Sequence, residues 1–141
     1  MTCTLTVCEG ENNERTISNP SLKMIKMAID DLIPEIFHFV ILEADPPVED
    51  CVYMQARIPG YGKMKGRYLV EARFTLANGP KHYRKHVEDA DGVKGVFQAF
   101  ARGVAPDIAG WDDITGKVTG NGNGEEPEAR PGQAQMESRY R

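Results

Sequence analysis

Histidine, cysteine and glutamate are the side chains of this 141-residue chain that could do chemistry, and they are few. The candidates for acid–base, nucleophilic or metal chemistry are His38, His82, His86, Cys51 and Glu71. Their spacing forms no recognisable catalytic triad. A serine nucleophile is nearly excluded, because no serine lies between Ser21 and Ser138 and the motif G-x-S-x-G is therefore absent. We expect no catalytic residues.

Metal and cofactor sites are also weakly supported. The three cysteines Cys3, Cys8 and Cys51 are odd in number, so a complete set of intrachain disulfides is impossible, and reduced thiols are expected. The stretch "PKHYRKHV" favours extended chain, which would hold His82 and His86 about 13 Å apart. We therefore predict no bound metal ion.

Two further segments contain residue types that can bind ligands. The segment "PGYGKMKGRY", residues 59–68, has three glycines and three basic residues but matches neither phosphate-binding glycine motif, and we interpret it as a hairpin loop. The adjacent carboxylates of Asp112 and Asp113 in "WDDI" diverge in most backbone geometries instead of chelating one ion. We predict no cofactor.

The hydrophobic pattern predicts an α+β domain that must position these residues. Helical spacing after Asn19 and Pro20 predicts a first helix with Asn19 as N-cap, ending at Pro34. Asp89 or Asp91 is expected to cap a second helix, whose buried stripe ends before Gly103 and is Val93, Val96, Phe97 and Phe100. Strands are predicted over 3–8, 36–43, 51–58, 67–76 and 81–87. The expected fold is an antiparallel sheet of about four to six strands with two main helices packed on it.

The chain divides by composition into a domain and a tail. Residues 1–118 hold the apolar pattern, whereas residues 119–141 are rich in Gly, Pro, Glu, Gln and Arg and are predicted to be disordered. Neither a membrane-spanning apolar run nor a secretory signal sequence is evident. We expect a cytoplasmic protein.

Charge is distributed unevenly along the domain. Residues 30–50 contain seven acidic residues and no Lys or Arg, whereas residues 57–86 contain eight basic residues and one acid, Glu71. A basic, tyrosine-containing segment could touch nucleic acid, but the domain is acidic overall and would be repelled. The acidic block could instead steer association with a basic protein.

The order of these features resembles the immunity proteins of bacterial polymorphic toxin systems, in particular the first-numbered immunity family, which is often encoded beside deaminase-type toxins. The resemblance covers roughly residues 3–115 and rests on a helix begun by "NPS", a strand "FHFVILE", a hairpin around "YLVEARF", a helix ending "FQAFARG" and a closing "WDDI". The residues that carry it are Phe97, Phe100, Gly103, Trp111, Asp112 and Ile114. The segments "EADPPVEDC" and "PGYGKMKG" match no motif of the family.

The resemblance implies a non-catalytic protein that neutralises a toxin by tight binding. We predict a cognate, basic toxin as the partner, no membrane association and a contact surface formed by Glu43, Asp45, Glu49, Asp50, Tyr61, Lys63 and Arg67. The alternative is a small ligand-binding or enzymatic α+β domain, for which a pocket lined by His38, Glu71 or Cys51 would speak. A nucleic-acid-binding module acting through residues 57–86 is the third hypothesis. The oligomeric state stays open.

Overall fold

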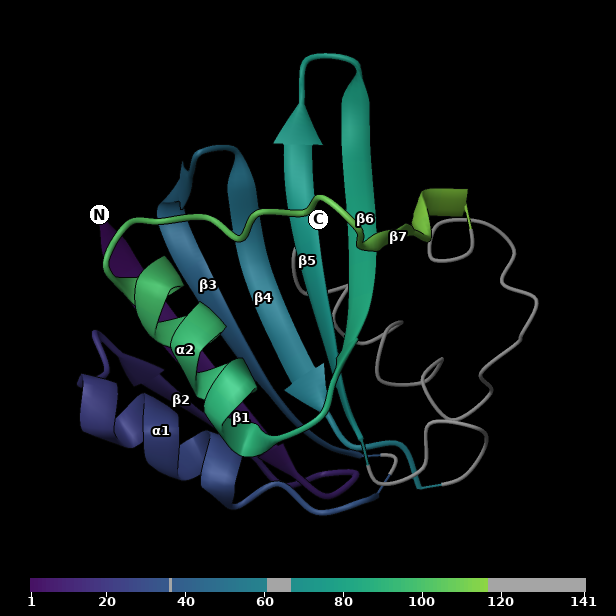
Figure 1. Cartoon of the computed structure of the whole chain (residues 1–141). Coiled ribbons are helices and arrows are strands. Elements are labelled where there is room, and N and C mark those ends of the chain that lie inside the picture. Colours follow the sequence, from purple (N-terminus) through teal and green to yellow (C-terminus); the bar gives the residue numbers. More distant parts are fainter. Residues whose placement is uncertain (36, 61–66, 117–141) are drawn as a thin grey trace.

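A computed structural model describes residues 1–35, 37–60 and 67–116 of the chain (Figure 1). The predicted tail, residues 119–141, and the predicted boundary at residue 118 lie outside the described residues. Tyr61 and Lys63 also lie outside them.

Seven strands form one antiparallel sheet. In chain order they are β1 (Thr2–Glu9), β2 (Glu14–Ser18), β3 (His38–Val48), β4 (Cys51–Arg57), β5 (Tyr68–Leu76), β6 (Gly79–Val87) and β7 (Asp112–Asp113). Their order across the sheet is β2-β1-β3-β4-β5-β6-β7, with every strand antiparallel to its neighbours. The predicted α+β fold is confirmed, with a strand count slightly above the expected four to six.

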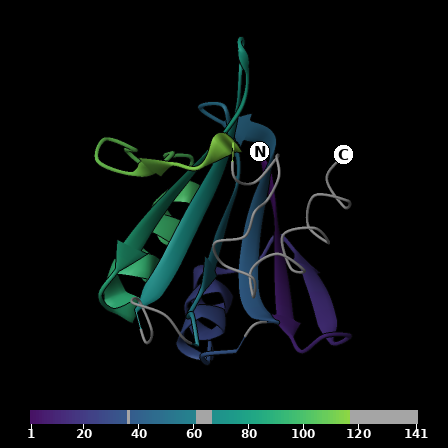
Figure 2. The ribbon, with the colours of Figure 1, turned by 90° about the vertical axis from the view of Figure 1, so that its right-hand side faces the viewer.

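Two helices, α1 (Leu22–Asp30) and α2 (Ala90–Ala101), lie on the same face of the sheet, as Figures 1 and 2 show. Successive side chains of the central strands point alternately to this helix-side face and to the opposite face. The main core lies on the helix side and includes Leu5, Val40, Leu42, Met54 and Val70, all essentially inaccessible to solvent. Among the described residues no helix covers the opposite face, which we call the polar face.

Helix α1 begins later than its sequence suggests. Ser21, not Asn19, is the N-cap, because its Oγ accepts a hydrogen bond from the Met24 backbone N–H at 3.1 Å. Asn19 has a positive φ of 51° and donates its N–H to the Cys3 carbonyl at 2.7 Å, so it extends the pairing of β2 with β1. The helix ends at Asp30, before the predicted Pro34. The Asn19 cap was therefore a wrong prediction.

Helix α2 follows its sequence pattern closely. The Asp89 carboxylate caps it by accepting from the Gly92 N–H at 2.9 Å. Val93, Phe97 and Phe100 are fully buried, and Val96 is partly buried. Gly103, with φ of 95°, follows the end of the helix and takes the left-handed conformation that glycine accepts without strain. The predicted cap, stripe and stop are confirmed.

Three parts of the sheet were not predicted, and the short strand β7 (Asp112–Asp113) is one of them. Strand β2, with the sequence "ERTIS", was not predicted because it is almost entirely exposed and carries no apolar alternation. Strand β3 continues through "EADPPV" to Val48, beyond the predicted end of this strand at residue 43. Pro46 and Pro47 are exposed and lie where the register of β3 against β4 shifts, so their missing N–H groups break no regular ladder.

Candidate functional site

Charged side chains gather on the polar face of strands β4, β5 and β6. Glu71 of β5 lies between Gln55 of β4 and Arg84 of β6 in one row across the sheet. Glu71 is fully buried, and its carboxylate binds the His82 Nε2 at 2.9 Å and the Arg84 Nη2 at 2.9 Å. A second nitrogen of Arg84, Nε, donates to the same carboxylate oxygen at 3.2 Å. One carboxylate of β5 is thus bonded to two residues of β6.

Opposing effects act on the ionisation of Glu71. Burial by itself would raise its pKa, but the hydrogen bond from His82 and the positive charges of Arg84 and Arg57 outweigh that effect. The pKa of Glu71 is held well below its usual range. An ionised carboxylate whose oxygens already accept from His82 and Arg84 is suited to holding strands together, and proton transfer to a substrate would first have to break those bonds.

The other residues considered for chemistry lie apart from this cluster. Cys51 is inaccessible on the helix side of the sheet, where burial raises the pKa of its thiol to about 12. A buried, protonated thiol is a poor nucleophile and a poor metal ligand. His38 is buried at the start of β3. The open hollow between β1 and β3, which is described below, is lined by none of His38, Glu71 and Cys51.

His82 and His86 both lie on β6, so the predicted extended chain between them is confirmed. Within the described part of the chain, no group of three or more His, Cys, Asp or Glu side chains could hold a metal ion. Asp112 and Asp113 pair with successive residues of β6, Arg84 and Tyr83. Successive strand residues point to opposite faces, which keeps the two carboxylates apart.

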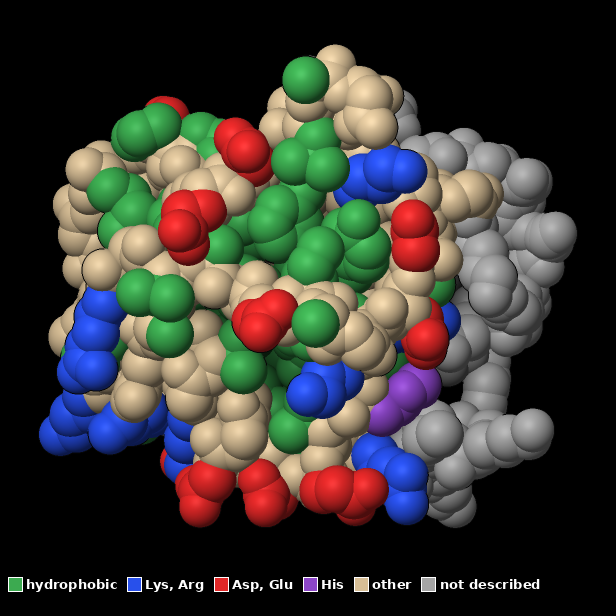
Figure 3. All heavy atoms as spheres, turned by 45° about the horizontal axis from the view of Figure 1, so that its top comes forward, with side chains coloured by type: hydrophobic (Ala, Val, Ile, Leu, Met, Phe, Trp, Pro, Cys, Tyr) green, Lys and Arg blue, Asp and Glu red, His purple; other side chains and the backbone are tan. Residues whose placement is uncertain are grey.

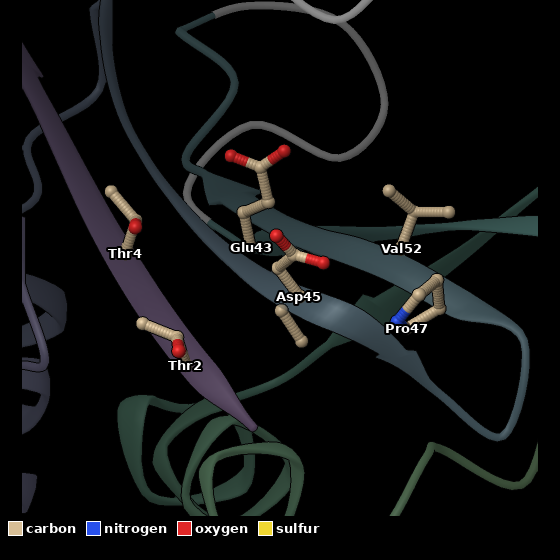
Figure 4. Close-up of a pocket in the computed structure, with 7 residues that line it drawn as sticks. Thr2, Thr4, Glu43, Asp45, Pro47 and Val52 are labelled. Carbon is tan, nitrogen blue, oxygen red and sulfur yellow. The ribbon is translucent and has the colours of Figure 1, made fainter.

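The predicted acidic residues occupy one end of the sheet. Glu43 and Asp45 lie on β3 and, with Thr2 and Thr4 of the adjacent β1, line an open hollow of about 420 Å³ (Figure 4). Pro47 and Val52 complete its edge. Asp45 is exposed and Glu43 is partly buried. Two carboxylates with two hydroxyl groups give this hollow the character of a site for a cationic side chain.

Glu49 and Asp50 form the turn between β3 and β4 at the same end. Both have positive φ, at 47° and 74°. The carboxylate of Glu49 accepts a hydrogen bond from the Ala105 N–H at 3.0 Å, and the Asp50 carbonyl accepts from the Thr75 N–H at 2.9 Å. The acidic turn is therefore tied to the loop that follows α2. Glu43, Asp45, Glu49 and Asp50 together are called the acidic end below.

The loop that follows α2 brings apolar groups next to this turn. Val104 is 54% exposed, and Ala105, Ile108 and Trp111 are partly buried against the core. Figure 3, which turns the top of Figure 1 toward the viewer, shows hydrophobic side chains near the middle of this surface with Asp and Glu side chains spaced around them. An apolar area with a charged rim is typical of protein interfaces.

Arg67 is the one predicted basic contact residue that the structure describes. It precedes β5 and forms an ion pair with Glu88, with 3.3 Å between Nη1 and Oε2. Because β4 runs from the acidic turn at Cys51 to Arg57, beside Leu69, Arg67 lies about 20 Å from the acidic end. The structure brings four of the predicted contact residues together and leaves Arg67 apart from them.

Sequence reasoning missed the partners of Glu71. Arg57 and Arg84 were noted only as charges of a basic segment, yet Arg57 is 2% exposed and Arg84 is held by Glu71. The alternation of side chains along β5 was a usable signal, because it places Glu71 and Arg73 on the more polar face of the strand. Only the register of β5 against β6 selects the bonded pair.

No family model, curated protein or solved structure matches this chain. No helix among the described residues is long and apolar enough to cross a membrane.

Proposed function

We propose that this protein is a non-catalytic immunity protein that binds and neutralises a cognate, basic bacterial toxin through the acidic end of its sheet. The observation that carries the proposal is the gathering of Glu43, Asp45, Glu49 and Asp50 at one end, beside an exposed apolar loop. Apolar groups supply anchors, and surrounding charges accelerate association and select the partner.

The burial of the chemically capable residues supports binding over catalysis. The thiol of Cys51 is protonated and inaccessible, and Glu71 and His82 bind each other within the fold. The enzymatic or ligand-binding alternative depended on a pocket that such residues would line, and the hollow at the acidic end contains none of them.

The burial of basic residues weighs against the nucleic-acid hypothesis. Arg57 is almost inaccessible, and Arg84 is engaged by a buried carboxylate. These two side chains of the basic segment are therefore not presented to phosphate groups, and neutralised phosphates supply most of the affinity for nucleic acids.

We expect the gene beside this one to encode a toxin-type protein, and the proposal is tested by co-expressing the C-terminal domain of that protein with the chain. The chain is expected to restore growth and to form a complex. Its association rate should fall when ionic strength rises and when Asp45→Lys and Asp50→Lys are combined. Arg67→Glu, about 20 Å away, is the matched charge reversal and should leave the rate nearly unchanged.

Failure of the neighbouring toxin domain to bind would refute the immunity function. Binding that weakens with Arg67→Glu alone would reject the acidic end as the interface. The second result would point to an acidic partner that contacts the opposite end of the sheet.

A further inference from the structure

The polar face of the sheet is buried although no described element lies over it. Both helices pack on the other face (Figure 2). Side chains that five adjacent strands direct to the polar face are nevertheless at most 4% exposed, among them Cys8, Phe39, Gln55, Arg57, Glu71 and His82. The open face of an antiparallel sheet is ordinarily in contact with water. Burial of this extent requires a cover that the described residues do not supply.

Two buried acceptors on this face have no hydrogen-bond partner among the described groups. They are Gln55 Oε1 and His82 Nδ1. The His82 ring donates through Nε2 to the ionised Glu71 carboxylate, so its Nδ1 is left as an acceptor. A buried acceptor without a donor is costly. The cover is therefore expected to supply N–H or O–H groups.

The same face holds more buried positive than negative charge within the described part of the chain. Arg57, which is 2% exposed, and the partly buried Arg84 both interact with one buried carboxylate, that of Glu71. Burial of a cation is unfavourable unless an acidic group lies nearby. The cover is therefore expected to be acidic as well as rich in donors.

The C-terminal segment leaves the described residues at the edge of this face. The Ile114 N–H donates to the His82 carbonyl at 2.8 Å, and the His82 N–H donates to Thr115 Oγ1 at 3.0 Å. The buried strip runs from His82 of β6 to Cys8 of β1, which is four strand spacings or about 19 Å. An extended chain crosses that distance in about six residues, so residues 117–141 are long enough to cover it.

Residues 119–128 have the composition that this cover needs. Glycine takes every second position in "TGNGNG", residues 119–124, so one side of the extended chain carries no side chains and can approach the sheet closely. The next four residues, "EEPE", supply three carboxylates. Arg57 lies two strands across and four residues along from His82, about 16 Å away, and the ten residues from Thr115 to Glu125 span up to about 33 Å.

Residues 61–66, between β4 and β5, are the other stretch of chain near this face. Their sequence "YGKMKG" contains two lysines and no acidic residue. Placed over Arg57, they would add positive charge where negative charge is needed. Charge therefore selects the C-terminal segment.

We propose that residues 119–128 lie across the polar face, with the glycines against the buried strip and Glu125, Glu126 and Glu128 next to Arg57. The N–H groups of the segment then donate to Gln55 Oε1 and His82 Nδ1. Composition predicts disorder for residues 119–141 because few of them are apolar, but a face with buried polar and positive groups is matched by a polar, acidic segment. The inference does not depend on the proposed toxin binding, and its test contains no toxin.

The test measures backbone order in the full-length chain by ¹⁵N relaxation. Residues 119–128 are expected to have order parameters of about 0.85, as in rigid backbone, and values below about 0.6 would overturn the proposal. Nuclear Overhauser contacts between the glycine Cα protons and the ring protons of Phe39 or Tyr53 are expected, because both rings lie on the polar face. An ordered segment without contacts to this face would overturn the proposal equally.

A pair of charge variants tests the contact with Arg57. Replacing the three acids, Glu125→Gln, Glu126→Gln and Glu128→Gln, should lower the order parameters of residues 119–128 below about 0.6. Replacing three later cations, Arg130→Gln, Arg139→Gln and Arg141→Gln, removes as many charges and should leave the segment ordered. Unchanged sheet resonances show that each variant is folded. An equal response to the two sets would reject the pairing with Arg57.

A pair of size variants tests the close approach of the glycines. Gly122→Val places a branched side chain between the segment and the sheet and should release the segment. Asn123→Val places the same side chain on the outward side and should leave the segment ordered. If Gly122→Val stayed ordered, the glycines would not face the sheet and the proposed placement would be wrong.

Discussion

Glu71 bonds to His82 at 2.9 Å, although the residue directly opposite His82 across β5 and β6 is Arg73. The direct partner of Glu71 is Arg84, which it also binds. One buried carboxylate therefore joins its direct and its diagonal neighbour. This arrangement fixes the register of the two strands, because a slip by one residue would move Glu71 to the other face.

The first prediction follows from the lowered pKa of Glu71. Glu71→Gln should lower the free energy of unfolding at pH 7 by about 3–5 kcal/mol, because it leaves the partly buried Arg84 without its counter-charge. The wild-type advantage is fully present above the pKa of an unfolded glutamate, about 4.3, and is lost as pH falls toward the lower folded-state pKa. Urea unfolding from pH 7 to pH 3 should show the two curves converging. Parallel curves would mean that ionisation of Glu71 does not stabilise the fold.

The second prediction separates the charge of Glu49 from its hydrogen bond. Glu49→Gln keeps an oxygen that can accept from the Ala105 N–H, whereas Glu49→Ala removes it and should cost about 1 kcal/mol of stability. Both variants remove the charge and should slow association with the toxin domain equally. If Glu49→Gln bound at the wild-type rate and only Glu49→Ala bound slowly, the contribution of Glu49 would be to shape the loop.

The third prediction concerns Trp111, the only tryptophan. The residue packs against the core but is only partly buried, so it covers the end of the core incompletely. Trp111→Ala should cost about 2 kcal/mol, below the roughly 3–5 kcal/mol of a fully buried aromatic side chain. Thermal unfolding with and without the toxin domain tests this. Normal stability with lost binding would make Trp111 an interface anchor.

The fourth prediction compares two glycines in the first turns of α2. A Cβ on Gly95 would meet nothing within 4 Å, and Gly95→Ala should stabilise the helix by about 1 kcal/mol. A Cβ on Gly92 would lie 2.7 Å from Val87 Cγ1, and Gly92→Ala should destabilise the protein by about 1–3 kcal/mol. Opposite shifts of the thermal midpoint are expected. Equal shifts would indicate that α2 and β6 are packed differently.

Sequence predicted the parts of the fold whose burial follows a clear period. The stripe of α2 follows a clear helical period with Asp89 as its cap, and the apolar residues of β1, β4 and β5 are buried in the core. Strand β2 was missed because its side chains are exposed and only its backbone makes it a strand. Asparagine is a residue type that often caps helices, but the backbone of Asn19 pairs with Cys3 and so extends the sheet.

The candidate site could also be predicted from the sequence only in part. Glu43, Asp45, Glu49 and Asp50 are close together in the sequence, and Glu49 and Asp50 are adjacent, so their gathering at one end of the sheet could be anticipated. The bonds of Glu71 to His82 and Arg84 span eleven and thirteen residues and depend on strand register, which the sequence alone does not specify. The bond from Ala105 to Glu49 spans 56 residues and needs the position of α2 relative to the sheet.

The strand order has a consequence for how the chain is made. From β3 to β7, each strand lies beside the strand made just before it, so the sheet can grow by local steps as the chain leaves the ribosome. The residues that cover the β6 edge, Asp112 to Thr115, are the last of the described strands and bonds to be synthesised. Until they emerge, the nascent chain carries an open strand at each side of its sheet. A pause in translation before residue 112 would therefore be the point of greatest risk for association between neighbouring nascent chains.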